Sequence, residues 1–498
     1  MTDILAAFGL VFEPYTLFVI LLSAIFGLFV GAVPGLTATM ATALLVPVTF
    51  FMPPVPAIAS IVTATAMAIF SGDIPGALMR IPGTPASAAY TDESYMMTKN
   101  GHAETVLGAD LVFSVIGGIF GTVVLVTAAP SLAEVALKFS SFEYFWLVLL
   151  GLACAVIISM GDTLKGVVSL LGGLLISAIG LDNPAGYPRF TFGSIELLGS
   201  VGLIPMMIGM FAVSEILRYA VSTDDHAEVF RAQIGNVFRG MWGLCKRYPW
   251  SILRGSALGT AIGALPGAGA DIAAWMSYAM SKKFSRTPEK FGTGHVEGIV
   301  EAGAANNSAL AGAWIPALVF GIPGDSITAI VIGVLYIKGM NPGPTIFINN
   351  PSSIYAVFIV FFLANLLMIP LGWACIKAGR RILDVPRNIL MPIILLFCVV
   401  GAFAINNTIF AVTVILVFGV VAYFMEENGY PIAPAILGVI LGSMLEENFV
   451  SSMIKADGRF LGFFERPIAG VLGVMTILVW VWPLAKWLRS RAGATAPA

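Results

Sequence analysis

Hydrophobic residues run along this chain in blocks long enough to cross a lipid bilayer, with polar residues gathered in the connections between them. A spanning helix needs about 20 apolar residues, so some blocks have room for two passes and the whole chain for roughly ten to twelve. The blocks lack the alternating pattern of an outer-membrane barrel, so we predict an all-α polytopic membrane protein. The blocks are 15–50, 106–129, 144–180, 195–217, 251–281, 304–337, 354–376, 389–425, 431–445 and 468–485.

Two of these blocks contain the same interruption. Gly31-Ala-Val-Pro-Gly-Leu-Thr-Ala-Thr39 corresponds to Gly263-Ala-Leu-Pro-Gly-Ala-Gly-Ala-Asp271 at an offset of 232 residues. A Pro-Gly pair removes a backbone donor and favours a break in a helix. Broken apolar helices at matching points of two halves are typical of the substrate sites of membrane transporters.

A second pair of interruptions follows in the same order. Residues 74–83 match residues 315–324 at an offset of 241, and each copy ends in Ile-Pro-Gly. Irregular backbone at membrane depth is tolerated only where protein buries it or where it lines a cavity. The repetition of two motifs in one order predicts an internal repeat.

Charged residues suggest how the two halves are oriented. The connection 218–254 carries six basic residues and is expected to face the cytoplasm, whereas basic residues on both sides of 255–280 suggest a re-entrant hairpin. Its counterpart, 23–48, has no basic flank, which favours opposite orientation. We therefore predict inverted-topology halves at 1–217 and 255–485, followed by a cytoplasmic tail at 486–498.

The first pair of breaks supplies candidate ion ligands. Free carbonyls and hydroxyls at a break suit Na⁺, and free N–H groups suit a carboxylate. The alternative is that the glycines permit close helix packing and the threonines bond their own turn. The cation candidates here are Thr37, Thr39, Gly269 and Asp271, beside substrate candidates Gly35 and Gly267.

The second pair of breaks supplies candidate contacts to a substrate. Small hydroxyl and acidic residues follow each Ile-Pro-Gly, where a new helix would begin with unpaired N–H groups. Each of them alone would suit a helix N-cap, whereas as a symmetric pair they fit two tips of one pocket. The candidates are Pro82, Gly83, Thr84, Pro85 and Ser87 in one half, and Pro323, Gly324, Asp325 and Ser326, with Thr328 as a cation ligand, in the other.

Two further polar features lie in apolar surroundings. Asn306 and Asn307 are adjacent amides that would bind a cation or substrate, or else form an interhelical hydrogen bond. Arg80 is either a counter-charge for an anion or a side chain that snorkels to an interface.

Composition narrows the function classes. Of 498 residues, 58% are hydrophobic and 11% charged, and mean hydropathy is +0.93, too apolar for a soluble protein of this size. The net charge of −2 is uninformative about nucleic acid, and the sequence shows no soluble domain that would bind it. Neither the three histidines nor the four cysteines have metal-ligand spacing, no removable signal peptide is apparent, and no catalytic motif suggests an enzyme.

An ordered set of motifs carries a family resemblance. They are Gly31-Ala-Val-Pro-Gly-Leu36, Ile81-Pro-Gly-Thr-Pro-Ala86, Gly263-Ala-Leu-Pro-Gly-Ala-Gly269, Ala304-Ala-Asn-Asn307 and Gly321-Ile-Pro-Gly324. The set resembles the large membrane subunit of the tripartite tricarboxylate transporters. Family members often have Pro-Glu before Ala-Ala-Asn-Asn, where this chain has Ala302-Gly303, and Asp-Gly-Tyr-Pro-Met where it has Glu93-Ser-Tyr-Met-Met97.

The resemblance implies a secondary transporter of the bacterial inner membrane. It implies a periplasmic solute-binding protein and a small four-span membrane subunit as partners, with Na⁺ or H⁺ as coupling ion and no other cofactor. We expect symport of a small organic anion, a di- or tricarboxylate, by an elevator-like movement. A passive anion channel and a non-conducting scaffold subunit are the alternatives, and a homo-oligomer stays open.

Overall fold

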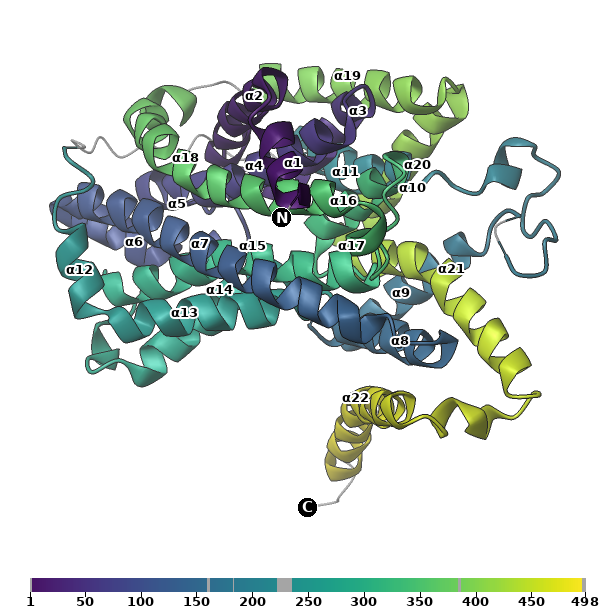
Figure 1. Cartoon of the computed structure of the whole chain (residues 1–498). Coiled ribbons are helices and arrows are strands. Elements are labelled where there is room, and N and C mark those ends of the chain that lie inside the picture. The colour runs from purple at the N-terminus through teal and green to yellow at the C-terminus, as the bar shows by residue number, and fades with distance from the viewer. Residues whose placement is uncertain (1, 159–161, 182, 222–234, 384–386, 495–498) are drawn as a thin grey trace. The chain divides into compact units, whose positions relative to one another are not determined.

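The chain folds almost entirely into helices, as Figure 1 shows. The computed structural model describes residues 2–158, 162–181, 183–221, 235–383 and 387–494. Within these ranges, the only extended pairing is an isolated bridge between Gly180 and Arg189. The prediction of an all-α polytopic membrane protein is confirmed. Arg231 of the basic connection and residues 495–498 of the predicted tail lie outside the described residues.

The helices form two compact units, each built from two separate stretches of chain. The larger unit comprises Met1–Ala133 and Ile204–Tyr423. It contains both pairs of breaks and takes stretches of chain from both predicted halves. Its elements are α1 (Thr2–Val11), α2 (Pro14–Ala32), α3 (Ala38–Phe50), α4 (Pro54–Ser71), α5 (Asp73–Met79), η1 (Ser87–Ala89), α6 (Thr91–Met97), η2 (Thr98–His102), most of α7 (Ala103–Ala136) and α10 (Leu203–Ile208), η4 (Gly209–Val213), α11 (Ser214–Val221), α12 (Met241–Arg247), α13 (Pro249–Gly263), α14 (Gly269–Phe284), η5 (Pro288–Lys290), α15 (Val296–Phe320), α16 (Ser326–Ile337), α17 (Ile346–Asn349), α18 (Pro351–Leu383), α19 (Arg387–Asn406) and most of α20 (Ile409–Glu427).

The smaller unit comprises Glu134–Leu203 and Phe424–Ala498. Its helices pack around an aromatic core in which Trp146 donates a hydrogen bond to the Phe463 carbonyl at 3.0 Å. Arg466 also pairs with the buried carboxylate of Glu143 at 2.6 Å. The elements are α8 (Ser141–Ile158), α9 (Thr163–Ser177), η3 (Glu196–Gly199), α21 (Ile432–Lys455), η6 (Phe460–Phe464) and α22 (Pro467–Ala494).

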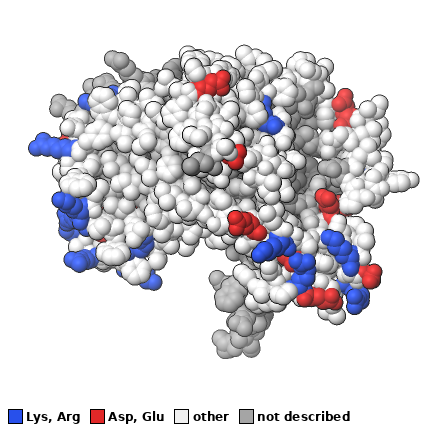
Figure 2. Space-filling view, viewed as in Figure 1, with Lys and Arg blue, Asp and Glu red and all other residues white. Residues whose placement is uncertain are grey.

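Many helices are long and apolar enough for a bilayer. Seven of those in the described ranges meet the length and composition of a span. Another seven apolar helices are 10–17 residues long, so the predicted total of spans stays a prediction. Uncharged residues cover most of the face in Figure 2, as a lipid-facing surface requires. The seven candidate spans are Pro14–Ala32, Pro54–Met79, Thr91–Ala136, Leu203–Val221, Pro351–Gly379, Ile409–Glu427 and Ile432–Lys455.

Both Pro-Gly motifs break their helices. The first separates α2 from α3, and the second separates α13 from α14. Gly35 and Gly267 occupy equivalent positions with φ of 86° and 83°, a left-handed conformation that favours glycine. With 15 and 16 residues, α13 and α14 are each shorter than the ~20 residues of a span. Both pack against α15, as a re-entrant pair would.

The Ile-Pro-Gly segments also end helices at equivalent positions. Helix α5 ends at Arg80 with φ of 59°, and α15 ends at Gly321 with φ of 69°. A left-handed residue commonly closes a helix, and glycine adopts that conformation without steric cost. Arg80 therefore holds a strained backbone that its counterpart avoids.

Equivalent glycines bring α2 into close contact with α4, and α13 into close contact with α15. A Cβ atom at any of four of them would lie 2.2 or 2.3 Å from a carbonyl oxygen of the facing helix. Only glycine allows this approach, because real Cβ atoms do not come so close. The contacts repeat at the same offsets, 232 and 241, as the sequence motifs. The pairs are Gly27 with Ala64, Gly31 with Ala68, Gly259 with Ala305 and Gly263 with Ala309.

Substitution of Gly27 tests whether this packing stabilises the fold. In Gly27→Ala, the new methyl would meet Ala64 at 2.2 Å, so we expect overpacking to cost about 1–3 kcal/mol. The measurement is the apparent thermal midpoint of the purified chain in detergent. Gly9→Ala in α1 is the matched control, because nothing lies within 4 Å of its Cβ and alanine favours helix. Equal midpoints for the two variants would contradict the prediction.

Candidate functional site

The segments after the two Ile-Pro-Gly breaks begin with the same reciprocal cap. Thr84 and Ser87 each donate a backbone N–H to the other's hydroxyl at 3.1 Å. In the other half, Thr328 N donates to Asp325 Oδ1 at 2.8 Å, and Asp325 N donates to Thr328 Oγ1 at 2.9 Å. Asp325 and Thr328 thus form a capping box at the start of α16, and Thr84 and Ser87 repeat its reciprocal hydrogen bonds in the turn before η1.

A break of the first half lies against a helix of the second. Trp275 Nε1 of α14 donates to the Pro85 carbonyl at 3.2 Å. One turn earlier, the Asp271 carboxylate approaches the Ala86 backbone N–H and the charge of Asp325. Asp271 is exposed, whereas Ala86 is buried. Asp271 therefore lies beside the backbone polar groups of Pro85 and Ala86, where the break of the first half meets α14 of the second.

The two breaks of the second half also touch each other. Gly267 N donates to the Gly324 carbonyl at 2.8 Å. A Cβ at Gly269, where φ is 60°, would lie 2.7 Å from the Asp325 Cβ, so the start of α14 meets the start of α16. Gly267, Gly269, Asp271, Gly324 and Asp325 therefore form one local assembly.

The first half repeats part of this arrangement. A Cβ at Gly83 would approach the carbonyls of Gly72 and Gly31, as one at Gly324 would approach Ala313 and the Gly263 carbonyl. Thr37 caps α3 by accepting the Met40 N–H at 3.1 Å, which satisfies one backbone donor freed by the break.

The remaining candidates differ in exposure: Gly35, Thr39 and Ser326 are half-buried, Pro82 and Pro85 are exposed, and Pro323 is buried.

The two asparagines lie inside α15 and face different neighbours. Asn306 Nδ2 donates to the Tyr90 hydroxyl at 3.3 Å, and Asn307 Nδ2 contacts Met368 Sδ at 3.5 Å. Both side chains are buried, and neither amide oxygen has a hydrogen-bond partner among the described residues. Two residues near this point were not among the candidates: Tyr90, which contacts Asn306, and Asp110, which interacts electrostatically with Tyr90. An acid alone in the apolar run 106–129 was the available signal for Asp110.

Arg80 does not face the interior. Its guanidinium pairs with Asp92 at 2.8 Å, and the two side chains are 63% and 68% exposed. Such an exposed pair contributes little to stability. Of the two readings of Arg80, a position at an interface fits this geometry better than a buried counter-charge.

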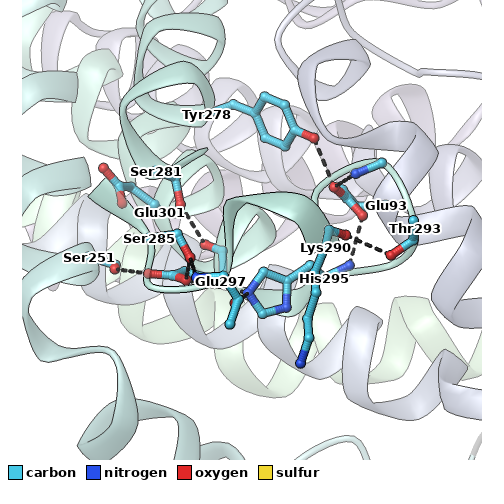
Figure 3. A network of polar contacts seen from close by, with 12 residues as sticks. Glu93, Ser251, Tyr278, Ser281, Ser285, Lys290, Thr293, His295, Glu297 and Glu301 are labelled. Atoms are coloured by element: carbon cyan, nitrogen blue, oxygen red, sulfur yellow. Dashed lines mark hydrogen bonds and ion pairs between the residues drawn. The ribbon is translucent and has the colours of Figure 1, made fainter. Parts of the chain in front are cut away.

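Glu93 connects the first half to the loop before α15, as Figure 3 shows. This fully buried carboxylate accepts from Tyr278 Oη at 2.8 Å and from the Gly294 and His295 N–H groups at 2.7 Å each. It also accepts from Gly292 N. Glu93, which belongs to a motif that departs from the family pattern, therefore holds the 291–295 loop in place.

Two further acids anchor the same region. Glu297 accepts from Ser251 at 3.1 Å and from Ser285 at 2.6 Å, as Figure 3 also shows. Glu301, which is fully buried, receives two hydrogen bonds from Arg254 at 2.6 and 2.5 Å. This bidentate geometry compensates the buried charge. Both acids therefore serve the packing of α13 against α15.

Comparisons with known proteins agree with this architecture. A model of the tripartite tricarboxylate transporter TctA family matches residues 17–437. The chain belongs to this family. The match covers both pairs of breaks, and membership makes the protein a membrane component of a tripartite transport system.

Two curated relatives come from Agrobacterium vitis. An uncharacterized 52.8 kDa protein in the TAR-I ttuC′ 3′ region is 32% identical over 99% of this chain and 98% of its own length. An uncharacterized protein in the TAR-II ttuC′ 3′ region is 33% identical over 47% of this chain and 96% of its own length. No solved structure matches the chain.

Removal of the Glu93 carboxylate should release the loop that it holds. Glu93→Ala leaves backbone groups such as the Gly294 and His295 N–H without their acceptor. Each buried N–H group that lacks a hydrogen-bond partner costs about 1–3 kcal/mol of folding free energy. We expect faster tryptic cleavage at the neighbouring Lys290 on purified protein. Glu465→Ala, which removes an exposed acid far from Lys290 in the sequence, is the control. Unchanged cleavage in Glu93→Ala would show that the loop is held by other contacts.

Two substitutions at Asp325 separate its cap from its charge. Asparagine can still accept the Thr328 N–H, so Asp325→Asn should keep the thermal midpoint near that of the parent chain. Asp325→Ala removes the acceptor and should cost about 1 kcal/mol. Thermal unfolding in detergent measures both variants. A larger loss in the asparagine variant than in the alanine variant would contradict the capping role.

Proposed function

We propose that this TctA-family protein is the translocating subunit of a cation-coupled symporter for a small organic anion, a di- or tricarboxylate. The contact between the Pro85–Ala86 break and α14 carries the proposal, because it joins interrupted elements of both halves at one place. Transporter sites of this kind hold substrate and coupling ion together.

The chemistry of the contact suits a cation and a carboxylate. Asp271 and Asp325 interact electrostatically, so a cation between them would reduce their repulsion. Such a cation would then attract the carboxylate of a substrate. Pairing of ion and anion at one site is the physical basis of obligatory coupling.

Alternating access follows if the two halves have inverted topology. Equivalent glycine contacts, left-handed caps and reciprocal N-caps recur at the same sequence offsets, which supports a repeat. In inverted repeats, the two halves exchange conformations and open the site to either side in turn. We propose that the unit that carries the breaks moves as a body, in the manner of an elevator.

Family membership supports a proposal for the membrane in which the protein acts and for its partner proteins. We propose a bacterial inner-membrane setting, in which a periplasmic solute-binding protein delivers the anion and a small four-span subunit completes the assembly. These partners would dock on surfaces outside the broken segments. Membership in a tripartite family is the support for both partners.

Uptake into proteoliposomes tests the proposal. The full chain, reconstituted with its small subunit and loaded binding protein, should concentrate a labelled di- or tricarboxylate when a Na⁺ or H⁺ gradient is imposed. Asp271→Asn should reduce this uptake by tenfold or more, on the order of the loss of one charge-assisted contact of about 1.5–3 kcal/mol. Glu289→Gln, on an exposed loop, is the matched control.

Other outcomes distinguish the alternatives. Uptake that only equilibrates the anion would identify a passive channel. No flux with intact assembly would identify a scaffold subunit. Full gradient-driven uptake in Asp271→Asn would retain the transporter and remove this residue from the site.

A further inference from the structure

A second polar cluster lies inside the larger unit, apart from the contact of Asp271 with Asp325. Tyr90 is at its centre and donates its hydroxyl proton to Asp73 Oδ1 at 2.7 Å, while Asn306 Nδ2 donates to the same hydroxyl at 3.3 Å. Asp110 on α7 interacts electrostatically with both Asp73 and Tyr90. Four elements, α5, α7, α15 and the segment between η1 and α6, thus bring their polar groups to one point.

All four side chains are inaccessible to solvent. Their exposed fractions are 2% for Asp73, 1% for Tyr90, 1% for Asp110 and 0% for Asn306. Burial of carboxylates is costly unless a partner compensates the charge. Neither Asp73 nor Asp110 takes part in an ion pair within the described parts of the chain.

Several oxygen atoms of this cluster lack a partner. Both carboxylate oxygens of Asp110, the second oxygen of Asp73 and the amide oxygen of Asn306 have no hydrogen bond among the described residues. Ser114, one turn after Asp110 on the same helix face, has an unpartnered buried hydroxyl as well. Buried polar atoms in native proteins are nearly always satisfied, so several unpaired oxygens together indicate a missing ligand.

The missing ligand should be a cation, because every unpaired atom is an oxygen and two belong to acids. A single proton would satisfy only one or two of these atoms, whereas a metal ion contacts several at once. The Tyr90 hydroxyl stabilises the Asp73 carboxylate by a hydrogen bond, so Asp110 is the acid that most needs a cation. Mg²⁺ demands near-octahedral coordination and Ca²⁺ takes six to eight oxygens, more than this cluster offers.

We infer that Asp73, Asp110 and Asn306, positioned by Tyr90, form a buried Na⁺ site. The inference rests on the proposed cation-coupled transport and adds a second ion position to it. The internal repeat does not duplicate this site. At the offset of 241, Trp314 stands in place of Asp73 and Val331 in place of Tyr90, while Thr65 replaces Asn306 and bonds Thr42 at 2.9 Å instead.

Direct Na⁺ binding tests the site without any transport. Purified full-length protein in detergent is heated in NaCl, KCl or choline chloride at one ionic strength, and radioactive sodium binding is measured in parallel. We expect Na⁺ alone to raise the melting temperature in a concentration-dependent way. Asp110→Asn should lose both this rise and the sodium binding that accompanies it, yet melt no lower than the parent chain in choline, because it removes an uncompensated charge.

A matched control and a second variant complete the test. Asp162→Asn removes a carboxylate that caps α9 in the smaller unit, and asparagine preserves the cap, so the Na⁺ response should persist. Asn306→Ala should weaken the response by removal of a neutral ligand. Either variant of the cluster with an unchanged Na⁺ response would overturn the inference.

The outcomes keep this site separate from the proposed function. A melting temperature that responds to pH but not to Na⁺ would mean that the acids share a proton, and would overturn the Na⁺ site. A response to Mg²⁺ in place of Na⁺ would overturn it too. If Na⁺ binds as expected while reconstituted protein transports nothing, the site stands and the symport proposal fails.

Discussion

Backbone groups in an apolar medium need hydrogen-bond partners, and this constraint governs the larger unit. Every helix break frees N–H and carbonyl groups that lipid cannot satisfy. The chain meets the need locally, with caps at Thr37, Thr84 and Asp325, and by the bond between Gly267 and Gly324. Glycine contacts between facing helices exclude lipid from the same region. A break is therefore stable here only because tightly packed helices enclose it.

The breaks themselves could be predicted from sequence because their causes are local. Pro-Gly and Ile-Pro-Gly interrupt a helix through missing donors and left-handed backbone wherever they occur. The capping role of Ser87 or Thr328 was foreseen as an alternative for the same reason. Partners distant in the chain could not be foreseen. Asp110 and Asn306 are separated by nearly two hundred residues, and only tertiary packing reveals that they share a neighbour.

Two acids at or beside the positions where the chain departs from the family pattern illustrate the same limit of prediction from sequence. Glu93 lies at one departure from the family pattern and Glu301 directly before the other, and sequence shows only their position within motifs. In the structure, one accepts backbone N–H groups of a loop and the other accepts two bonds from Arg254. Both are buried and compensated. The charges left without such compensation, chiefly Asp110, are the ones that indicate an ion.

The reciprocal caps differ in one respect, since the first half uses neutral Thr84 where the second uses Asp325. Asp271 likewise stands opposite Thr39, so the acids at the breaks fall in the second half. In a carrier whose halves exchange conformations, a symmetric sequence would give two end states of equal energy. This unequal distribution of charge removes that degeneracy. The empty carrier should accordingly have a preferred resting orientation, and filling its ion positions would determine when it leaves that orientation.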